Sequence, residues 1–276
     1  MSIEKIITLD GLRTFKEQMD AQSILKRWPD GPEAHNAMWG GRDITAAFDD
    51  DTVSAHIYDG TFKDIFPGDY ITKSVTISGK TYDVTWVVAD CDYWINIGGE
   101  AMEEHHVVIV PQAPIFSANM NATGTTKGGY AGSRMYKETI PVCADGIVEA
   151  FGWRHILSFR DSIVQSVNDS SISSGAPFGT GTSYDSDWYD AQCNLMCERM
   201  VYGMSAFSSS GREAGAATRQ LSAFRLSTKL INYNRSSWWL RDVASSANFA
   251  LVSNFGDASM GYASGVFGVR PFALLC

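Results

Sequence analysis

Thiols and imidazoles are the side chains of this sequence that could carry covalent or metal chemistry. The five cysteines are Cys91, Cys143, Cys193, Cys197 and Cys276. Cys193 and Cys197 fall within a segment that we expect to be helical, where their spacing places both thiols on one face and could supply half of a metal site. No histidine and no second cysteine pair has complementary spacing. We therefore expect ordinary buried thiols rather than a metal centre.

The histidines and the acidic residues give no stronger candidate. His105 and His106 are adjacent in an expected strand, so their side chains point to opposite faces and cannot chelate one ion together. The acidic triplet 49–51 lacks the alternating carboxylates and the glycine turn of a calcium loop, which favours a solvated loop. His155 could act as a general base only with a partner that the sequence does not identify. We expect a structural role for all five histidines.

Motifs of the common catalytic machineries are absent from the sequence. The chain contains no nucleophile elbow, P-loop, zinc-protease helix or dinucleotide fingerprint. We interpret Asp161 beside Arg160, and Asp242 beside Arg241, as local ion pairs or turn-forming residues. Arg241 and Arg270 lie inside apolar runs, where a planar guanidinium can bond carbonyl and carboxylate groups while its stem packs against apolar side chains. We expect these two arginines to be buried and to pin irregular loops.

The composition narrows the class of protein. The chain has 276 residues, of which 45% are hydrophobic, and its formal net charge is −9. Lysine and arginine are scattered, which leaves no electrostatic footprint for nucleic acid. No window approaches the roughly 18 consecutive apolar residues that membrane insertion requires, and the N-terminus lacks the basic region and apolar core of a secretion signal. An odd number of cysteines without such a signal argues against a disulfide framework.

The sequence divides into three expected segments. Residues 1–30 form an expected N-terminal helix, in which apolar residues follow an Asp10 N-cap at helical spacing. We favour an anchoring or oligomerising helix over one packed on its own domain, because it precedes the globular pattern and ends in a Pro/Gly-rich boundary. Residues 31–61 form an expected linker with a small β-rich segment, and residues 62–276 form one large α+β domain.

Local patterns predict the elements of the large domain. Residues 71–77 and 82–89 form an expected hairpin around the turn Ser78–Lys80. The other expected elements are strands at 105–111 and 155–159, a connector at 160–162, helices at 132–140 and 145–153, a loop at 168–184, and an amphipathic helix at 187–202 that turns Trp188, Tyr189, Leu195, Met196 and Met200 toward the core.

The stretch 236–276 has a different pattern. Two apolar motifs, Trp238–Arg241 and Gly268–Phe272, bracket a segment of small, polar and aromatic residues. Inside the bracket, apolar positions roughly alternate with polar and aromatic ones. We interpret the motifs as framework and the interior as a displayed surface, in which small polar residues give adaptable hydrogen bonds and aromatic rings give rigid contact area.

These motifs carry a family resemblance. The succession of Trp238–Arg241, a Ser/Ala/Asn-rich stretch and Gly268–Phe272 resembles the C-terminal domain of C-type-lectin-fold proteins in the formylglycine-generating-enzyme-like branch. More narrowly, it resembles the variable proteins of diversity-generating retroelements and phage tail receptor-binding proteins with that domain. Upstream segments fall in the expected order: Gly68–Ile71, Trp86–Val88, Gly132–Tyr136, Leu157–Asp161 and Asp187–Tyr189. The resemblance covers residues 62–276 and implies an α+β, C-type lectin fold.

The resemblance also implies a variable region at residues 231–267. In that family, a reverse-transcribed copy of a template, mutated at adenines, replaces the end of the gene. The positions that fit are Tyr233, Asn234, Ser236, Asn248, Ser253, Asn254, Phe255, Asp257, Ser259, Gly261, Tyr262, Gly265 and Phe267. Their side chains would form a solvent-exposed ligand-binding face, with Tyr233, Phe255, Tyr262 and Phe267 as aromatic anchors.

Departures from the family argue against catalysis and against a cofactor. The enzymatic relatives use a cysteine pair near the active site, whereas the C-terminal cysteine here is the last residue, Cys276. Calcium-dependent lectins of the wider fold use a Glu-Pro-Asn-type motif, and this chain has none. We therefore expect no enzyme activity and no obligatory cofactor.

The function that the resemblance implies is host attachment. The chain would be a virion protein of a phage tail or fibre tip, made in the host cytoplasm, that binds a bacterial cell-surface ligand, either protein or glycan. Its N-terminal segment would attach to other virion tail proteins, and several copies would assemble into a homo-oligomer, with a trimer as the expected form; multiple copies raise avidity without new contacts. Two alternatives stay open: a formylglycine-type oxidase or related surface-acting enzyme, and an inert structural virion component.

Overall fold

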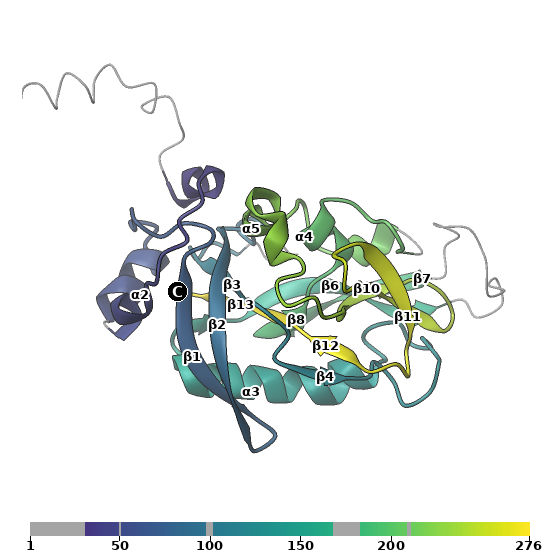
Figure 1. Cartoon of the computed structure of the whole chain (residues 1–276). Coiled ribbons are helices and arrows are strands. Elements are labelled where there is room, and N and C mark those ends of the chain that lie inside the picture. The colour runs from purple at the N-terminus through teal and green to yellow at the C-terminus, as the bar shows by residue number, and fades with distance from the viewer. Residues whose placement is uncertain (1–30, 50, 98–101, 168–182, 209–210) are drawn as a thin grey trace, which may run out of the picture.

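The computed structural model of the protein describes residues 31–49, 51–97, 102–167, 183–208 and 211–276. The expected N-terminal helix at 1–30 and most of the expected loop at 168–184 lie outside the described residues. The described chain is an α+β fold, with most of its elements in curled sheets and few helices (Figure 1). No helix in this part of the chain has both the length and the apolar character that crossing a bilayer requires.

The described chain contains short helical elements and strands that form three sheets. The helical elements are η3 (Pro32–Ala37), η4 (Thr45–Asp49), α2 (Asp51–Tyr58), η5 (Met135–Thr139), α3 (Ile140–Phe151), α4 (Glu198–Tyr202), η7 (Gly211–Ala214), α5 (Ser222–Leu226) and η8 (Thr228–Leu230). The strands are β1 (Tyr70–Ile77), β2 (Lys80–Cys91), β3 (Val107–Pro111), β4 (Phe116–Ala118), β5 (Ile156–Leu157), β6 (Phe159–Val167), β7 (Ser183–Ala191), β8 (Cys193–Leu195), β9 (Trp238–Val243), β10 (Asn248–Val252), β11 (Ala258–Tyr262), β12 (Phe267–Val269) and β13 (Pro271–Leu275). The larger sheet has the order β1-β2-β3-β13-β5 with β8 beside β13, the smaller sheet has the order β11-β10-β9-β12-β4, and β6 pairs with β7.

A long hairpin forms one side of the larger sheet. β1 pairs with β2 over its whole length. The two-residue turn between them has Ser78 at φ 50° and Gly79 at φ 76°, and such positive φ angles belong to the turn type that matches the twist of the flanking strands. The predicted hairpin is therefore confirmed.

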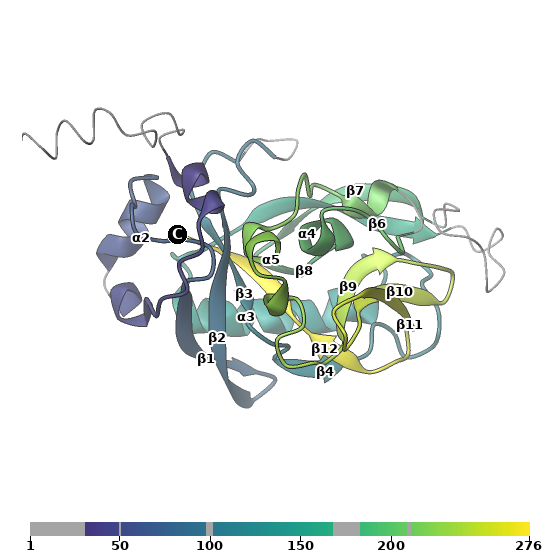
Figure 2. The same ribbon diagram turned by 45° about the horizontal axis from the view of Figure 1, so that its top comes forward.

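The C-terminal strand β13 lies in the middle of the larger sheet, where it pairs with β3, β5 and β8 and is completely buried. Side chains that alternate along β2 belong to two different hydrophobic clusters, one on each face of the larger sheet. Trp86 and Val88 belong to the cluster that includes α3, while Val87 and Ala89 belong to the cluster that includes α4 and α5. Helices thus cover both faces (Figures 1 and 2), which explains why the central strands are continuously apolar.

The smaller sheet continues directly from the larger one. Only Arg270 separates β12 from β13, and β9 to β12 all come from residues 238–269. In the hairpin of β10 and β11, Phe249 lies opposite Gly261 and Leu251 lies opposite Ser259. β11 is one edge strand of this sheet, and β4 is the other. The stretch 236–276 therefore supplies both the central strand of the core and most of the smaller sheet.

The described part of residues 31–61 contains three helical elements and no strand, so the prediction of a small β-rich segment is wrong. η3, η4 and α2 occupy this part of the chain, and its one strand-like pairing among the described residues is a bridge between Asp43 and Tyr70. The run Val53–Ile57 fits a period of two, but its two ends are also one helical turn apart, and Ile57 is fully buried in the core. Helix and strand patterns overlap in short apolar runs, so packing against the domain decides between them.

The predicted helix at 187–202 and the predicted connector at 160–162 are also wrong. The connector belongs to β6, and the supposed helix is the end of β7, then β8, then the short helix α4. Pairing of β7 with β6 and of β8 with β13 overrides the helical pattern. Cys193 consequently lies in β8 and Cys197 just before α4, so the two thiols do not share a helix face. Trp188 is 38% exposed instead of core-facing.

Candidate binding surface on the smaller sheet

Exposed aromatic side chains gather at β11 and at the loops around it. Phe255, Tyr262 and Tyr233 are 71%, 65% and 57% exposed. Large aromatic side chains are usually well covered in a folded chain, and aromatic residues are enriched where proteins bind partners. We call the surface formed by residues 232–236, residues 253–257 and β11 the display face.

Two adjacent tryptophans anchor the strand beneath the display face. Trp238 and Trp239 are consecutive in β9, so they point to opposite faces of the sheet, and each is buried in a different hydrophobic cluster. The indole N–H of Trp238 donates to the carbonyl of Ile231 at 3.0 Å, and that of Trp239 donates to the carbonyl of Ala118 at 2.8 Å. β9 is therefore tied both to the chain that enters the display face and to β4.

Two buried arginines fix the ends of the same stretch, which confirms that both are buried, although Arg241 bonds to strand β6 and not to an irregular loop as predicted. Arg241 forms a buried ion pair with Asp161, in which Nη2 lies 3.0 Å from Oδ1. Arg270 donates to the carbonyl of Pro111 at 2.7 Å and to the carbonyl of Leu230 at 3.0 Å. No carboxylate of the described residues pairs with Arg270, and burial lowers its pKa to about 9.

The pair of Arg241 and Asp161 replaces the local ion pairs expected from the sequence. Neighbouring residues in a strand point to opposite faces, so Arg160 lies 3.2 Å from Asp190 of β7 instead of pairing with Asp161. Asp242 accepts a hydrogen bond from the first backbone N–H of α4 at 2.8 Å. Burial, together with nearby carboxylates, raises the pKa of Asp242 well above its usual range. These contacts fasten β9 to β6 and to α4.

A tight loop presents Phe255. The N–H of Ser253 donates to the carbonyl of Asp257 at 2.8 Å, while the Ser253 hydroxyl oxygen accepts from the N–H groups of Phe255 and Asp257 at 3.1 and 3.2 Å. Gly256 has φ 92°, a conformation that strains residues with a Cβ, and its carbonyl accepts a 3.1 Å hydrogen bond from the hydroxyl of Tyr202. The loop backbone is thus held in place while the Phe255 ring stands in solvent.

A second loop presents Tyr233 beside the first. The side chain of Asn232 donates to the carbonyl of Asn254 at 2.5 Å, which joins the two loops. The side-chain oxygen of Asn234 accepts from the N–H of Ser236 at 3.2 Å, as asparagine often does in turns. Backbone groups and short polar side chains hold this loop as well, which leaves the Tyr233 ring available.

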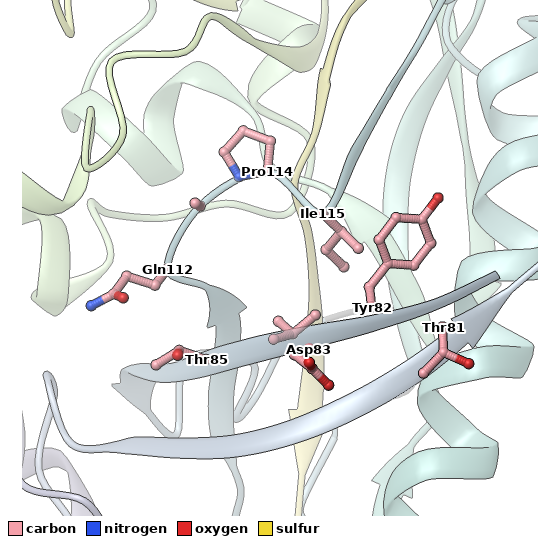
Figure 3. A pocket seen from close by; sticks show the side chains of 9 residues that line it. Thr81, Tyr82, Asp83, Thr85, Gln112, Pro114 and Ile115 are labelled. Atoms are coloured by element: carbon pink, nitrogen blue, oxygen red, sulfur yellow. The ribbon is translucent and has the colours of Figure 1, made fainter.

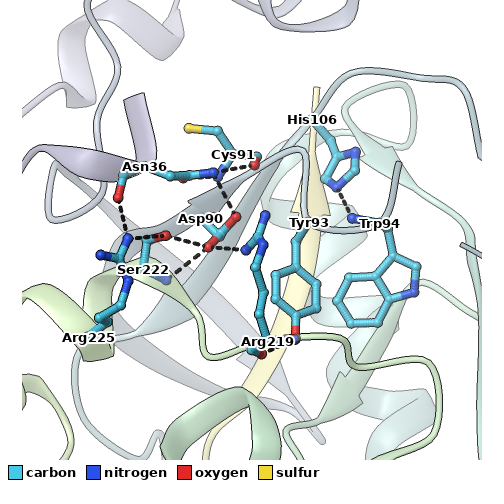
Figure 4. A network of polar contacts seen from close by, with 9 residues as sticks. All are labelled: Asn36, Asp90, Cys91, Tyr93, Trp94, His106, Arg219, Ser222 and Arg225. Atoms are coloured by element: carbon cyan, nitrogen blue, oxygen red, sulfur yellow. Dashed lines mark hydrogen bonds and ion pairs between the residues drawn. The ribbon is translucent and has the colours of Figure 1, made fainter. Parts of the chain in front are cut away.

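Asp90 of β2 anchors the segment that leads into the display face (Figure 4). Its buried carboxylate accepts from the hydroxyl and N–H of Ser222 at 2.7 and 2.9 Å and from Nη1 of Arg219 at 2.7 Å. The side-chain amide of Asn36 donates to its other oxygen at 3.1 Å. Burial raises the pKa of Asp90, and the charge of Arg219 opposes this shift. α5 and η3 are thereby tied to the larger sheet, and the chain continues from α5 through η8 into the Tyr233 loop.

β11 turns alternate side chains toward solvent. Met260 and Tyr262 lie opposite Ala250 and Asn248 on β10 and are 45% and 65% exposed. Gly261, between them, points to the other face and is buried. This period of two is what a half-buried edge strand requires.

The structure divides the predicted ligand-binding positions into three groups. Tyr233, Asn234, Ser236, Asn254, Phe255, Asp257 and Tyr262 are exposed; Asn248, Ser253, Ser259, Gly265 and Phe267 are half-buried; Gly261 is buried. The exposed group comes from two loops, which the hydrogen bond of Asn232 to Asn254 joins, and from the end of β11 at Tyr262.

Gly261 is buried, so the prediction that it lies on a solvent-exposed face is wrong, and the half-buried Phe267 ring packs onto the framework. The Phe267 ring packs edge-on against Trp239, with 4.8 Å between ring centres and an interplanar angle of 88°, a favourable arrangement for aromatic pairs. A Cβ added at Gly261 would come within 2.8 Å of side-chain atoms of Leu251 and Phe267. The register with β10 sets which side chains of β11 face inward, and a shift of one residue would reverse them all.

Met260 and Val266 are exposed residues of this region that the sequence prediction missed; they are 45% and 64% exposed. The two-residue spacing of Met260 from Tyr262 is the signal that could have identified it. Val266 carries no periodic signal, because it follows the turn in which the N–H of Gly265 donates to the carbonyl of Tyr262 at 2.7 Å.

The cysteines are all buried. Burial raises the pKa of Cys143 and Cys197 to about 12 and that of Cys276 to about 11, so these thiols stay protonated near neutral pH and are poor nucleophiles. Within the described ranges, no group of three or more histidine, cysteine, aspartate or glutamate side chains is placed to hold a metal ion.

Comparisons of the chain with protein-family models, with curated proteins and with solved structures gave no match in any of the three.

Proposed function

We propose that this protein is a phage virion receptor-binding protein with a C-type lectin fold, and that its display face binds a bacterial cell-surface ligand without catalysis. The observation that carries the proposal is the exposure of Tyr233, Phe255 and Tyr262 on backbone that hydrogen bonds hold in place. Aromatic rings offer a large contact area with few torsions to order, so a rigidly presented ring loses little entropy when it binds.

The separation of framework from displayed side chains supports the further proposal of retroelement diversification. Adjacent residues of the region have opposite roles: Gly261 is buried, whereas Tyr262 is exposed. Substitutions at exposed side chains usually change the free energy of unfolding by less than about 0.5 kcal/mol, whereas substitutions in the core have far larger effects. A surface that varies from one gene copy to the next needs this separation.

We also propose how the protein assembles into the virion. Residues 1–30 attach the protein to other virion tail proteins, and the chain forms a homo-oligomer, with a trimer as the expected form. Several display faces on one particle would raise avidity, so that a ligand bound weakly by each copy still retains the particle.

Binding to intact bacteria tests the proposal. Fluorescently labelled full-length protein is incubated with a panel of bacterial strains and measured by flow cytometry. A variant that carries Tyr233→Ser, Phe255→Ser and Tyr262→Ser should lose binding to the strains that wild type labels. Trp153→Ser is the matched control, because Trp153 is 71% exposed but lies just after α3, outside the display face. Equal binding by the triple variant and the control would contradict the proposal.

Exchange of residues 231–267 with those of a natural variant of the gene extends the test. Under the proposal, the strain preference follows the exchanged segment while the melting temperature stays close to that of wild type. A strain preference that stays with the remainder of the chain would show that the ligand binds elsewhere.

A further inference from the structure

One edge of β2 is unpaired near the tip of the long hairpin. β2 begins at Lys80, but its pairing with β3 begins only at Trp86, opposite Pro111. The carbonyl of Thr85 accepts one more hydrogen bond, from the N–H of Gln112 at 2.8 Å, and the chain then turns away toward β4. Residues 80–84 therefore have β1 on one side and, among the described residues, no strand on the other.

The geometry of the hairpin identifies the free backbone groups. In a hairpin with a two-residue turn, the residues flanking the turn form the first hydrogen-bonded pair, and the pairs then alternate. Lys80, Tyr82 and Val84 consequently bond to β1, while the N–H and C=O groups of Thr81 and Asp83 point away from it. No hydrogen bond within the described part of the chain satisfies these outward-facing groups.

A groove of about 410 Å³ lies against this edge (Figure 3). Thr81 to Thr85 form one wall, and Gln112 to Ile115 form the other. Strands that hydrogen-bond to each other lie only about 4.8 Å apart, so an occupant that pairs with β2 must also fit in front of Pro114 and Ile115. The second wall favours a single extended chain over the edge of another folded sheet.

The side chains along the groove define the chemistry of the occupant. Tyr82 and Ile115 line one side, where the Lys80 ammonium lies 4.7 Å from the centre of the Tyr82 ring, and the Asp83 carboxyl points to the other side of the strand (Figure 3). A positive charge on the occupant is therefore favourable on the Asp83 side only, and the side that meets Tyr82 should be uncharged. Asp83 is the one charged residue among those that line the groove. One of its oxygens accepts from the hydroxyl of Ser74 at 2.6 Å, which leaves the other available. An alternating peptide with apolar residues on one side and a lysine or arginine on the other matches this pattern, since opposite charges on facing strand positions stabilise a sheet.

We propose that the free edge of β2 is a docking site for one extended, basic and alternately apolar peptide segment of another polypeptide, which adds a strand beside Thr81–Thr85. Main-chain hydrogen bonds to Thr81 and Asp83 supply affinity, and the contacts of alternate side chains with Tyr82 and Asp83 supply specificity, as in other cases of strand addition. An exposed strand edge is a ready template for such pairing.

A designed peptide serves as the probe. Its sequence is Thr-Val-Lys-Val-Lys-Val-Thr, with a fluorescein label, and its binding to the full-length protein is followed by fluorescence anisotropy. Alternate amides of an added strand face β2, so one probe is N-methylated at its valines and another at its polar residues. One of these two probes should fail to bind and the other should bind like the parent. A probe with glutamate in place of lysine should bind more weakly than the parent.

Substitutions at Thr81 isolate the backbone contribution. Thr81→Pro removes an N–H that the pairing with β1 does not use, and proline is tolerated at such edge positions. It should weaken binding of the parent probe by roughly 3- to 10-fold, the effect of one hydrogen bond. Thr81→Ala keeps the N–H and should bind like wild type. The melting temperature of each variant verifies that the hairpin remains folded.

Hydrogen exchange measured by mass spectrometry gives an independent readout. In the free protein the amides of Thr81 and Asp83 should exchange quickly while those of Tyr82 and Val84 are protected, and the parent probe should slow exchange at Thr81 and Asp83. Absence of binding at millimolar probe, equal binding of both N-methylated probes, or unchanged binding to Thr81→Pro would overturn the proposal. If oligosaccharides of a panel slow hydrogen exchange along the groove and the peptide does not, the groove is a sugar site, and the proposal is equally overturned.

Discussion

Phe255 and Phe267 form a matched pair for testing the division between framework and displayed residues. Both lie in the predicted variable region, but the Phe255 ring is 71% exposed, whereas the Phe267 ring packs edge-on against Trp239. The same substitution, phenylalanine to alanine, should therefore have opposite consequences at the two positions.

The magnitudes follow from burial. Truncation of a fully buried phenylalanine to alanine lowers the free energy of unfolding by about 3–5 kcal/mol. Phe267 is half-buried, so Phe267→Ala should lower it by about 2–3 kcal/mol, including the lost ring contact with Trp239. For a chain of this size each kcal/mol corresponds to about 2 °C in melting temperature, which gives a decrease of about 4–6 °C. Phe255→Ala should change stability by less than about 0.5 kcal/mol and the melting temperature by about 1 °C at most.

Differential scanning calorimetry of the full-length variants at one pH and one scan rate measures these shifts. The same two proteins are then compared for bacterial labelling, where Phe255→Ala should weaken binding despite its unchanged stability. A decrease in melting temperature for Phe255→Ala as large as that for Phe267→Ala would refute the reasoning, because it would place Phe255 in the framework.

Three further predictions concern the framework itself. Gly261→Ala should lower the free energy of unfolding by about 1–3 kcal/mol, because the added Cβ meets packed side chains. Ser264→Ala on the exposed turn should change it by less than about 0.5 kcal/mol. Urea denaturation compares the two variants, and equal effects would count against the placement of Gly261 in the framework. Arg241→Met should lower the free energy of unfolding by about 3–5 kcal/mol, because it leaves Asp161 charged and buried without its cationic partner. Adding Asp161→Leu should restore most of the loss, and a double variant as unstable as the single one would disprove this cause. Burial raises the pKa of the Glu213 carboxyl from 4.5 to about 7, so the folded state binds the carboxyl proton more tightly than the unfolded chain does. The stability that this difference contributes is present below pH 4.5 and is lost as the pH rises through 7. Glu213→Gln should therefore flatten the fall in melting temperature over this pH range, and an unchanged slope would contradict the assignment.

The parts of the fold that could be predicted from the sequence have local signals. The turn at Ser78 and Gly79 between β-branched runs identifies the hairpin by itself. Arg241 and Arg270 inside apolar runs indicate buried cations, because a guanidinium in such a run must find hydrogen-bond acceptors when the run is covered.

The parts that could not be predicted depend on pairing between distant segments. The inward orientation of Gly261 and Phe267 is set by the register of β11 with β10 and by the contact with Trp239, and neither leaves a pattern within the strand itself. The partner of Arg241 is likewise Asp161 rather than the adjacent Asp242, because strand neighbours point to opposite faces. The unpaired edge of β2 is visible only once the end of β3 is known.

Under the proposed function, the exposed side chains of the display face vary and bind while the framework beneath them stays constant. Sequencing residues 231–276 of this gene in many individual genomes of its natural population tests this division. Substitutions should concentrate at the codons of Tyr233, Asn254, Phe255, Asp257 and Tyr262, with the codons of Trp239, Gly261 and Arg270 unchanged. Substitutions spread evenly over framework and display face would contradict it.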